Sequence, residues 1–350
     1  MTIIQATESN YTAWDTYVLA HPQGNPYLLS AWSRAIAKAY RHRVYALLAE
    51  AAGRIVGVLP LVHIRHPLFG NTLFSMPYAD LGGLLADDDK AATALLDEAA
   101  RIAAGECIPT IELRQQTPLQ DGGAAKLHRS DAGIDKVRMV LELPDSVETL
   151  MAGFKAKLRS QIRRPQKEGL EIRTGGVELL EDFYRVFAEN MRDLGSPVHG
   201  RNFIAAVLNG FEGRGRVHLV HRAGEVYAAG ITLVCGSTVF NPWSSSLRRH
   251  SAASPNMLLY WAMLSDACEQ GARCFDLGRS TPGAGTHRFK QQWGAMEQPL
   301  HWQTLSTRRP EMDSAGGEMP SRQRAEQLWR RLPVAVSRVL GPPLRKYIGL

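Results

Sequence analysis

The chain has 350 residues, of which 45% are hydrophobic and 21% are charged, and this is enough apolar material for two domains that each bury a core. Its apolar runs, such as residues 56–62, are much shorter than the roughly 20 residues that span a bilayer, so the composition excludes a helical membrane protein. The net charge of +7 is concentrated, because residues 155–173 and 306–350 each carry +5 and the rest carries −3, which excludes a general nucleic-acid coat and favours local anionic partners.

The first half of the chain predicts an α/β domain over residues 1–145. A helical region is followed by a β-hairpin, a strand, an amphipathic helix and two closing strands, expected at residues 14–40, 47–59, 72–76, 90–104, 108–114 and 137–143. The helix has one apolar face, so we expect it to pack on the sheet.

The second half predicts a domain of the same class over residues 146–305. Its helices, strands and hairpin are expected at residues 146–169, 170–173, 177–191, 219–231, 238–244, 255–268 and 274–277. The helix that begins at Pro255 is apolar on nearly all sides and is therefore predicted to be buried. Residues 306–350 are predicted to be a linker and a basic amphipathic tail, which Pro342 and Pro343 break into two segments.

The two halves resemble each other at their hairpins. Residues 47–59 and 219–231 each read as a strand, a short Ala-Gly turn and a second strand that contains a glycine. The turn glycines, Gly53 and Gly224, are 171 residues apart, which is close to half the chain. Two copies of one α/β unit produce such a repeat, so we expect two tandem domains with mixed central sheets flanked by helices.

Residues 275–295 have the layout of a ligand site. A short apolar strand runs into a loop with glycines at 278, 283 and 285, and a helix begins near Thr286. Glycines permit a close approach of the backbone to a ligand, and the start of a helix offers N–H groups to an anion. Lys290 adds a positive charge one turn into this helix. Asp276 and Arg279 flank the end of the strand and are expected either to pair with each other or to contact substrate.

A basic stripe on the helix predicted at 146–169 indicates phosphate binding. Positive charges recur every four residues along it, at Lys155, Arg159, Arg163 and Lys167, with Lys157 and Arg164 beside them. We assign Arg159, Arg163 and Arg164 to substrate binding. A tRNA acceptor end, a CoA diphosphate and a nucleotide-linked sugar all satisfy this charge, and the alternative is a solvated helix face.

Several motifs occur together in one order. They are KLRSQIRRPQKEGL at 157–170, NMRDLGSPV at 190–198, NPWSSSL at 241–247, SPNMLLYW at 254–261, FDLGRS at 275–280, and GT, RFK and WGA at 285–286, 288–290 and 293–295. This ordered set resembles the Fem-like (FemAB) family, specifically the branch associated with exosortase (PEP-CTERM) systems, over most of residues 1–305. The resemblance implies two acyltransferase domains of the GNAT type. The best-known members of the family move an amino acid from aminoacyl-tRNA to a peptidoglycan precursor.

The resemblance also implies roles for individual residues. Lys290 is the candidate for stabilising the carbonyl or leaving oxygen, because it matches the Phe-Lys position of the Fem motif. Asn241, Trp243 and Ser244 lie on the central strand, where polar groups would line a GNAT cleft, and we place Asn241 and Ser244 with Lys290 as catalytic. Further substrate-binding candidates are Arg279, Ser280 and Thr286 in the signature motif, and Tyr78 and Asp80 after a strand of the first half. Tyr260 and Trp261 are expected to belong to the core.

The residues before the buried helix bear on whether acyl-CoA is the donor. GNAT domains that use acyl-CoA have an Arg/Gln-x-x-Gly-x-Gly/Ala loop here, and this chain offers Arg248, Ser251 and Ala253 in the corresponding positions. The arginine and the alanine fit the pattern, whereas Ser251 stands where glycine is expected. CoA therefore stays open as a donor.

The sequence thus predicts a transferase that moves an acyl or aminoacyl group onto an amine of a cell-envelope or exopolysaccharide precursor. No nucleophile elbow and no metal-ligand spacing is present, so we expect direct attack by the amine, with aminoacyl-tRNA or acyl-CoA as donor substrate and no tightly bound cofactor or metal. The alternatives are an acyl-CoA-dependent N-acyltransferase and a non-catalytic binding module for a nucleotide-linked sugar or a protein. The absence of a secretory signal and of a C-x-x-C pair favours the cytoplasm, and the tail favours peripheral contact with an anionic inner-membrane surface.

Overall fold

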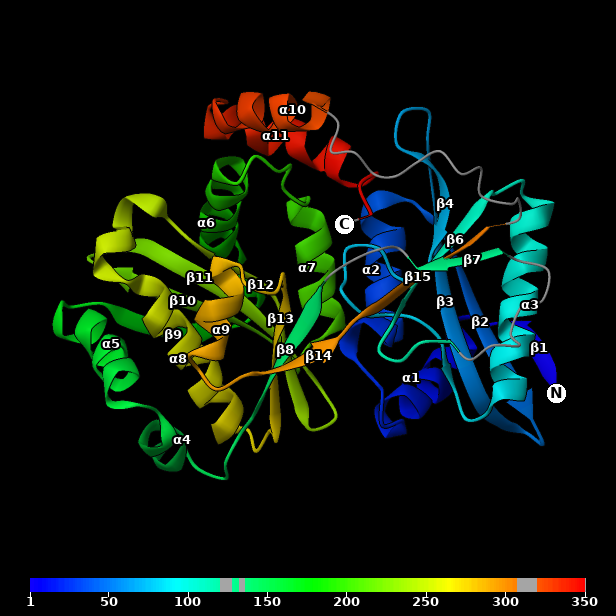
Figure 1. The fold of residues 1–350 in the computed structure, drawn as a ribbon, viewed down its shortest axis with the longest axis horizontal. Helices are drawn as coiled ribbons and strands as arrows, with labels where there is room; N and C mark the ends of the chain where they lie inside the picture. Colours follow the sequence, from blue (N-terminus) through cyan, green and yellow to red (C-terminus); the bar gives the residue numbers. More distant parts are fainter. Residues whose placement is uncertain (120–127, 132–135, 307–319, 350) are drawn as a thin grey trace. The chain divides into compact units, whose positions relative to one another are not determined.

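The computed structural model describes residues 1–119, 128–131, 136–306 and 320–349. It divides into two compact units, each with its own sheet (Figure 1). The first unit consists of Met1–Lys136, Pro299–Gly317 and Lys346–Leu350, and the second consists of Val137–Gln298 and Glu318–Arg345. Most of the linker predicted after residue 305 lies outside the described residues.

The first unit is built on a mixed sheet with the strand order β1-β2-β3-β4-β6-β15-β7, and β5 pairs with β3 at its side. Strands β4 and β6 run parallel to each other, and the other pairings between the described strands of this sheet are antiparallel. The strands are β1 (Thr2–Gln5), β2 (Arg43–Ala51), β3 (Arg54–His66), β4 (Gly70–Phe74), β5 (Leu85–Ala86), β6 (Thr110–Gln115), β7 (His128–Asp131) and β15 (His301–Ser306). The helices are α1 (Tyr11–Ala20), α2 (Ser30–Tyr40) and α3 (Asp89–Gly105), with 3-10 turns at Glu8–Asn10 and Pro26–Leu28.

Helix α3 shows why this unit folds as its sequence predicts. The Asp88 side chain caps its first turn by accepting a hydrogen bond from the Ala91 N–H. Its apolar positions, which include Leu95 and Ala99, are fully buried in one core cluster with residues of β2, β3 and β6. The predicted amphipathic helix is therefore confirmed, and it packs on the sheet as expected.

The second unit has a mixed sheet with the strand order β14-β8-β13-β12-β11-β10-β9. The strands are β8 (Val137–Glu142), β9 (Glu171–Gly175), β10 (Gly215–Arg222), β11 (Glu225–Cys235), β12 (Thr238–Ser246), β13 (Cys274–Ser280) and β14 (Met296–Pro299). The helices are α4 (Val147–Gly153), α5 (Ala156–Lys167), α6 (Leu180–Asp193), α7 (Arg201–Gly210), α8 (Pro255–Glu269) and α9 (Gly285–Gln291), with 3-10 turns at Val177–Leu179 and Arg248–Ala253.

Helix α8 has the buried environment that its sequence predicts. Leu258, Leu259, Met263 and Leu264 are fully inaccessible, and Pro255 occupies the first turn, where no backbone donor is lost. The expectation of one helix over 146–169 is wrong, because the chain is extended at Phe154 and divides it into α4 and α5. The Arg159 guanidinium stabilises this break by donating to the Phe154 carbonyl oxygen at 2.6 Å.

Two strands lie in a different unit from the one that the domain boundaries at 145 and 305 predict. Strand β8 pairs antiparallel with β13, with Leu141 opposite Phe275, and belongs to the second unit. Strand β15 pairs antiparallel with β6, with Leu305 opposite Ile111, and belongs to the first. Apolar alternation identifies a strand but does not specify its partner, so this exchange was not readable from the sequence.

The C-terminal tail forms helices α10 (Pro320–Arg330) and α11 (Val334–Arg345), which pack on α6 of the second unit (Figure 1). The break between them falls at Pro333, whose carbonyl oxygen accepts from the Ser337 N–H and so begins α11. The predicted break at Pro342 and Pro343 is wrong, because both prolines lie inside α11. In the part of the chain that the structure describes, no helix has the length and apolarity to cross a membrane.

Candidate functional site

Strands β12 and β13 separate in the middle of the second unit's sheet. They pair in parallel only from Thr238 to Phe240 and from Cys274 to Asp276. Beyond that point β13 continues its antiparallel pairing with β8, while β12 continues with β11. Ligands of α/β sheets bind where neighbouring strands part, so the residues that follow Phe240 and Asp276 are the first candidates for a site.

Asn241 holds a bulge in β12 at this point. Its side-chain amide donates to the carbonyl oxygens of Ile231 at 2.8 Å and Trp243 at 3.0 Å, and the residue is buried. Because of the bulge, Trp243 points to the opposite face from Asn241 and packs edge-on against Phe203 of α7. The structure therefore places these two predicted site residues in packing roles, apart from Ser244.

Ser244 meets a buried tyrosine of α8. The Ser244 hydroxyl lies 3.2 Å from the Tyr260 hydroxyl, and the Tyr260 ring packs edge-on against Phe289 of α9, with ring centroids 4.8 Å apart. Burial raises the pKa of Tyr260, an effect that the hydrogen bond from Ser244 opposes, so the phenol stays protonated at neutral pH. The sequence predicts Tyr260 only as a core residue. An apolar helix pattern does not show that its hydroxyl is available as a polar group.

A buried ion pair fixes the end of β13. The Asp276 carboxylate accepts from the Arg138 guanidinium of β8 at 2.6 Å and from the Gly278 N–H at 2.7 Å. Gly278 has a φ of +76°, which glycine adopts without strain, and it forms a bulge against β8. The expected pairing of Asp276 with Arg279 is therefore wrong, because Arg138 supplies the charge from a neighbouring strand.

Lys290 reaches back from α9 to the same bulge. Its ammonium group donates to the carbonyl oxygens of Gly278 at 3.0 Å and Arg279 at 2.8 Å, and the residue is only 6% exposed. The structure thus brings Lys290, Gly278 and Arg279 together where β13 leaves β12. Ser280 is buried and its hydroxyl has no partner among the described residues, whereas Thr286 is exposed at the start of α9.

The loop between β12 and α8 is held by charged and stacked side chains. Arg249 pairs with Glu189 of α6 and with Glu225, which lies 3.1 Å away. The His250 ring stacks on Tyr227 with centroids 3.7 Å apart. These contacts leave Arg248 and Ser251 exposed, with Ala253 partly buried beside them, directly before the first turn of α8. Such a helix start is suited to an anion.

The basic helix α5 lies next to this loop. The Arg164 guanidinium donates to the Ala252 carbonyl oxygen at 3.3 Å and to Glu168 at 2.7 Å. Arg159 is turned toward α4 instead. Four cations of the stripe are exposed and have no ion pair with any described residue: Lys155, Lys157, Arg163 and Lys167. Two segments that the sequence assigns separately to phosphate binding are therefore adjacent.

In the first unit, Tyr78 is covered by the chain's own C-terminal residues. Its N–H donates to the Gly349 carbonyl oxygen at 2.9 Å, and its hydroxyl donates to the Lys346 carbonyl oxygen. Arg114, which is fully buried, donates to the Ala79 and Gly349 carbonyl oxygens at 2.6 and 2.8 Å. The backbone of Asp80 accepts from the Trp302 indole at 3.0 Å. The acceptor role predicted for Tyr78 and Asp80 stays a prediction.

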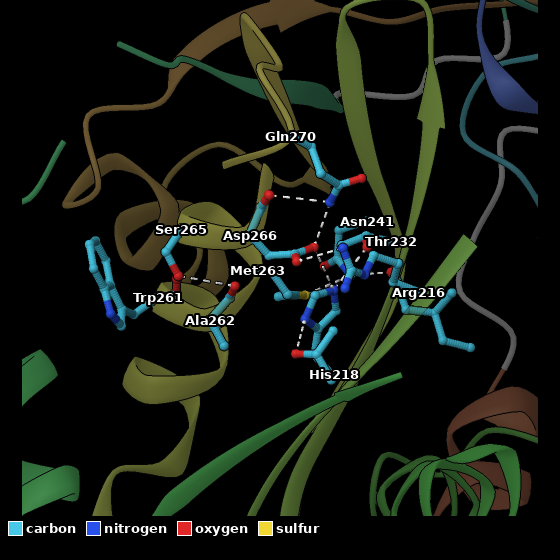
Figure 2. Close-up of polar contacts among 12 residues, drawn as sticks. Arg216, His218, Thr232, Asn241, Trp261, Ala262, Met263, Ser265, Asp266 and Gln270 are labelled. Carbon is cyan, nitrogen blue, oxygen red and sulfur yellow. Dashed lines mark hydrogen bonds and ion pairs between the residues drawn. The ribbon is translucent and has the colours of Figure 1, made fainter. Parts of the chain in front are cut away.

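A second polar cluster lies at the other end of α8. Figure 2 shows His218 of β10 between Thr232 and Asp266, and Asp266 also pairs with Arg216 at 3.0 Å. His218 is fully inaccessible, and burial together with the nearby Arg216 charge lowers its pKa to about 3. Because Asp266 is in the last turn of α8, this cluster is remote from the loop at 248–253 and has a structural role.

Acidification is expected to weaken the second unit through His218. Its pKa is about 3 when folded and near 6.5 when unfolded, so the unfolded chain binds the proton first and stability is lost as the pH falls from 6.5 toward 3. In urea denaturation, His218→Gln is expected to reduce the loss of unfolding free energy between about pH 7 and about pH 5 by roughly 2 kcal/mol. His199 is also buried and has a lowered pKa, but it is present in both proteins, so its effect is the same in both. An identical pH dependence in variant and parent would contradict the assignment.

In the described part of the chain, no three His, Cys, Asp or Glu side chains are grouped as metal ligands. Residues 152–291, which contain α5, the 248–253 loop and α9, match the family described as an acetyltransferase (GNAT) domain. This segment is therefore a GNAT domain.

One curated relative is the UDP-N-acetylmuramoylpentapeptide-lysine N(6)-alanyltransferase of Weissella viridescens. It is 24% identical over 178 residues, which are 46% of this chain and 51% of the relative. The chain thus spans about half the length of this relative. The relatives of this chain thus include an alanyltransferase. Membership of the exosortase branch, which the motifs indicate, stays a prediction.

Solved structures share the fold of most of the chain. A structure described as FemX superposes with a TM-score of 0.66 and 16% identity, covering 87% of this chain and 97% of that one. A tandem GNAT protein from the clavulanic acid biosynthesis pathway gives a TM-score of 0.54 at 13% identity and covers 89% and 99%. L-PGS from Bacillus licheniformis superposes with a TM-score of 0.56 at 11% identity, covering 96% of this chain and 98% of that one. The predicted fold of two tandem GNAT-type domains is confirmed.

Proposed function

We propose, from the GNAT domain at residues 152–291, that this protein is a Fem-like transferase that moves an aminoacyl group onto an amine of a cell-envelope acceptor. The observation that carries the proposal is the contact of Arg164 with Ala252, which joins α5, the helix with the unpaired cations, to the loop before α8. A donor that carries several phosphates near its reactive end fits this arrangement. An exopolysaccharide-related acceptor and membership of the exosortase branch are proposed on the sequence motifs alone.

The donor is proposed to be aminoacyl-tRNA. The unpaired cations extend along α5 for about three turns, from Lys155 to Lys167, and include Lys157 and Arg163. A binding site of this length is longer than one diphosphate needs. Arg163 and Arg164 are the proposed phosphate contacts. Arg159, which holds the α4–α5 junction, is proposed to position them.

The proposed chemistry is direct attack. The acceptor amine bonds to the donor's carbonyl carbon, the ester carbon–oxygen bond breaks, and the proton lost by the amine passes to the departing ribose oxygen. Lys290 of α9 stabilises the oxyanion where its ammonium group meets the end of β13, and Arg279 and Ser280 of β13 and Thr286 of α9 contact substrate. Ser244 and the protonated Tyr260 donate to the departing oxygen.

We propose a cytoplasmic location, with contact between the tail and the inner face of the membrane. This location supplies aminoacyl-tRNA and also places the enzyme where envelope precursors are assembled. The first unit, with Tyr78 and Asp80, is proposed to contribute to acceptor binding.

A second candidate function is acyl-CoA-dependent N-acylation, because the exposed Arg248 and Ser251 stand directly before the first turn of α8. In that reaction a thioester carbon–sulfur bond breaks in place of the ester bond. Ser251 replaces the glycine of the usual loop, so the backbone there is more restricted.

Thermal shift measurements are expected to separate the two donors. A ligand that binds only the folded protein raises its melting temperature with concentration. We expect uncharged tRNA and aminoacyl-tRNA to stabilise the protein, and we expect acetyl-CoA and longer acyl-CoAs to have no effect. Arg163→Ala should weaken the tRNA effect, whereas Arg54→Ala, on an exposed hairpin turn of the first unit, should leave it unchanged. A shift with acyl-CoA that Arg248→Ala abolishes would replace the tRNA proposal by the CoA alternative.

A further inference from the structure

Helix α11 buries a small polar residue and a glycine and exposes apolar side chains. Its buried side consists of Ser337, which is 1% exposed, and Gly341. A Cβ atom at Gly341 would lie 2.9 Å from the backbone nitrogen of Val198, so only a glycine permits this close packing. Apolar side chains away from this buried side are open to the solvent, with exposed fractions of 72% for Val339 and 46% for Leu340. A surface helix normally buries its apolar stripe, and this helix presents it to the solvent.

The exposed apolar side chains of the tail are numerous. Besides Val339 and Leu340 they are Val336, Leu344 and, on α10, Leu328. Apolar side chains exposed in this number on a folded unit indicate an interaction site.

The tail is held firmly on the second unit. The Arg192 guanidinium of α6 donates to the Leu332 carbonyl oxygen at 2.9 Å, and Arg338 pairs with Glu181 at 3.3 Å. Arg330 donates to the Leu194 carbonyl oxygen at 3.4 Å. These contacts join the helices to α6 and to the residue that follows it. The apolar side of α11 is therefore a stable feature of the surface.

The tail also has two arginine side chains without a partner. The guanidinium groups of Arg324 on α10 and of Arg331 at the turn into α11 are exposed and have no partner among the described residues. The segment 306–350 carries +5 as a whole. An anionic lipid surface satisfies both properties, because the apolar side chains enter the acyl boundary while the guanidinium groups contact phosphates.

A second copy of the chain fits this surface less well. A symmetric dimer brings the same patch of both subunits together, so two sets of unpaired arginines would meet. Like charges across an interface oppose association. The positive charge of the tail therefore favours an anionic bilayer over a second copy of the chain as the occupant of this surface.

We propose that the exposed side of α11, with Arg324 and Arg331 beside it, is a docking surface for an anionic lipid bilayer. This inference deepens the proposed function by naming how the enzyme reaches an acceptor at the membrane, and it rests on that function only in this respect. The chain lies on the bilayer and does not cross it.

Flotation of the full-length protein with vesicles tests the proposal. We expect binding to vesicles of phosphatidylcholine with phosphatidylglycerol at low salt, weaker binding at high salt, and little binding to phosphatidylcholine alone. The double variant Val339→Glu/Leu340→Glu should lose binding by a factor on the order of 100. Arg324→Gln/Arg331→Gln should lose about fivefold for each charge removed.

The control variant is Leu68→Glu/Phe69→Glu, which places the same charges on exposed apolar residues of the turn between β3 and β4. It should bind vesicles like the parent. The proposal is overturned if the parent does not bind anionic vesicles, or if the α11 variant binds as well as the parent. A parent dimer that the α11 variant converts to a monomer would show that a second copy is the occupant. Transfer to a water-soluble amine should be equal in all these proteins, so a failure of docking and a failure of the transfer chemistry are distinguishable.

Discussion

Replacing Lys290 by Met is expected to lower turnover by a factor on the order of 100 to 1000, the effect of removing one donor from an oxyanion site. Met keeps the length of the side chain and removes its charge. The same change removes the donor of the Gly278 and Arg279 carbonyl oxygens, so we also expect a loss of stability of about 1–3 kcal/mol. Single-turnover measurements with saturating donor report the chemical step directly.

The control for this experiment is a variant of similar stability without a role at the site. His218→Gln serves, because His218 is buried near the far end of α8. It should lose stability and keep its rate. If Lys290→Met is folded and turns over at the parent rate, Lys290 is only a structural group. If transfer activity is absent from the parent while ligand binding depends on Lys290, the protein is a recognition module.

Replacing Arg138 by Met is expected to lower the free energy of unfolding of the second unit by about 3–5 kcal/mol. Arg138 and Asp276 are 8% and 4% exposed, so the variant leaves a carboxylate buried without its cation. Urea denaturation followed by circular dichroism measures the effect. The surface pair of Arg101 and Glu98 provides the comparison, because Arg101→Met should change stability much less than Arg138→Met.

A double variant separates the charge from the packing. Arg138→Met with Asp276→Leu removes both charges and is expected to be more stable than Arg138→Met alone. If Arg138→Met costs less than about 1 kcal/mol, the ion pair does not hold the end of β13, and the geometry around Gly278 has another cause.

The sequence predicts most elements of the fold, but it does not predict the features that depend on which residues contact one another. The cap at Asp88 and the proline at 255 mark the starts of α3 and α8 through local contacts that a sequence pattern records. The exchange of β8 and β15 depends on pairing across the chain, which no local pattern contains. The division between α4 and α5 depends on Arg159 reaching back to Phe154.

The candidate site shows the same division. Lys290 and Arg279 were predictable as neighbours because the strand, loop and helix that contain them are contiguous. The pair of Ser244 and Tyr260 was missed, because an apolar helix pattern does not show which hydroxyl points toward a strand. Arg138 was missed for a related reason: it reaches Asp276 from a strand 138 residues away in the chain. The roles assigned to these side chains in transfer stay predictions.

The first unit begins before the second in the chain, yet it receives strand β15 only after most of the second has been synthesised. Strand β15 leaves the ribosome only after the whole segment Val137–Gln298 has been made, and the residues that cover Tyr78 follow at 346–349. Until then one edge of β6 lacks its antiparallel partner. The nascent chain therefore makes the segment Val137–Gln298 while the first unit still has an open strand edge, with which other chains can pair in the interval. Dividing the gene between the two units would leave this edge open permanently.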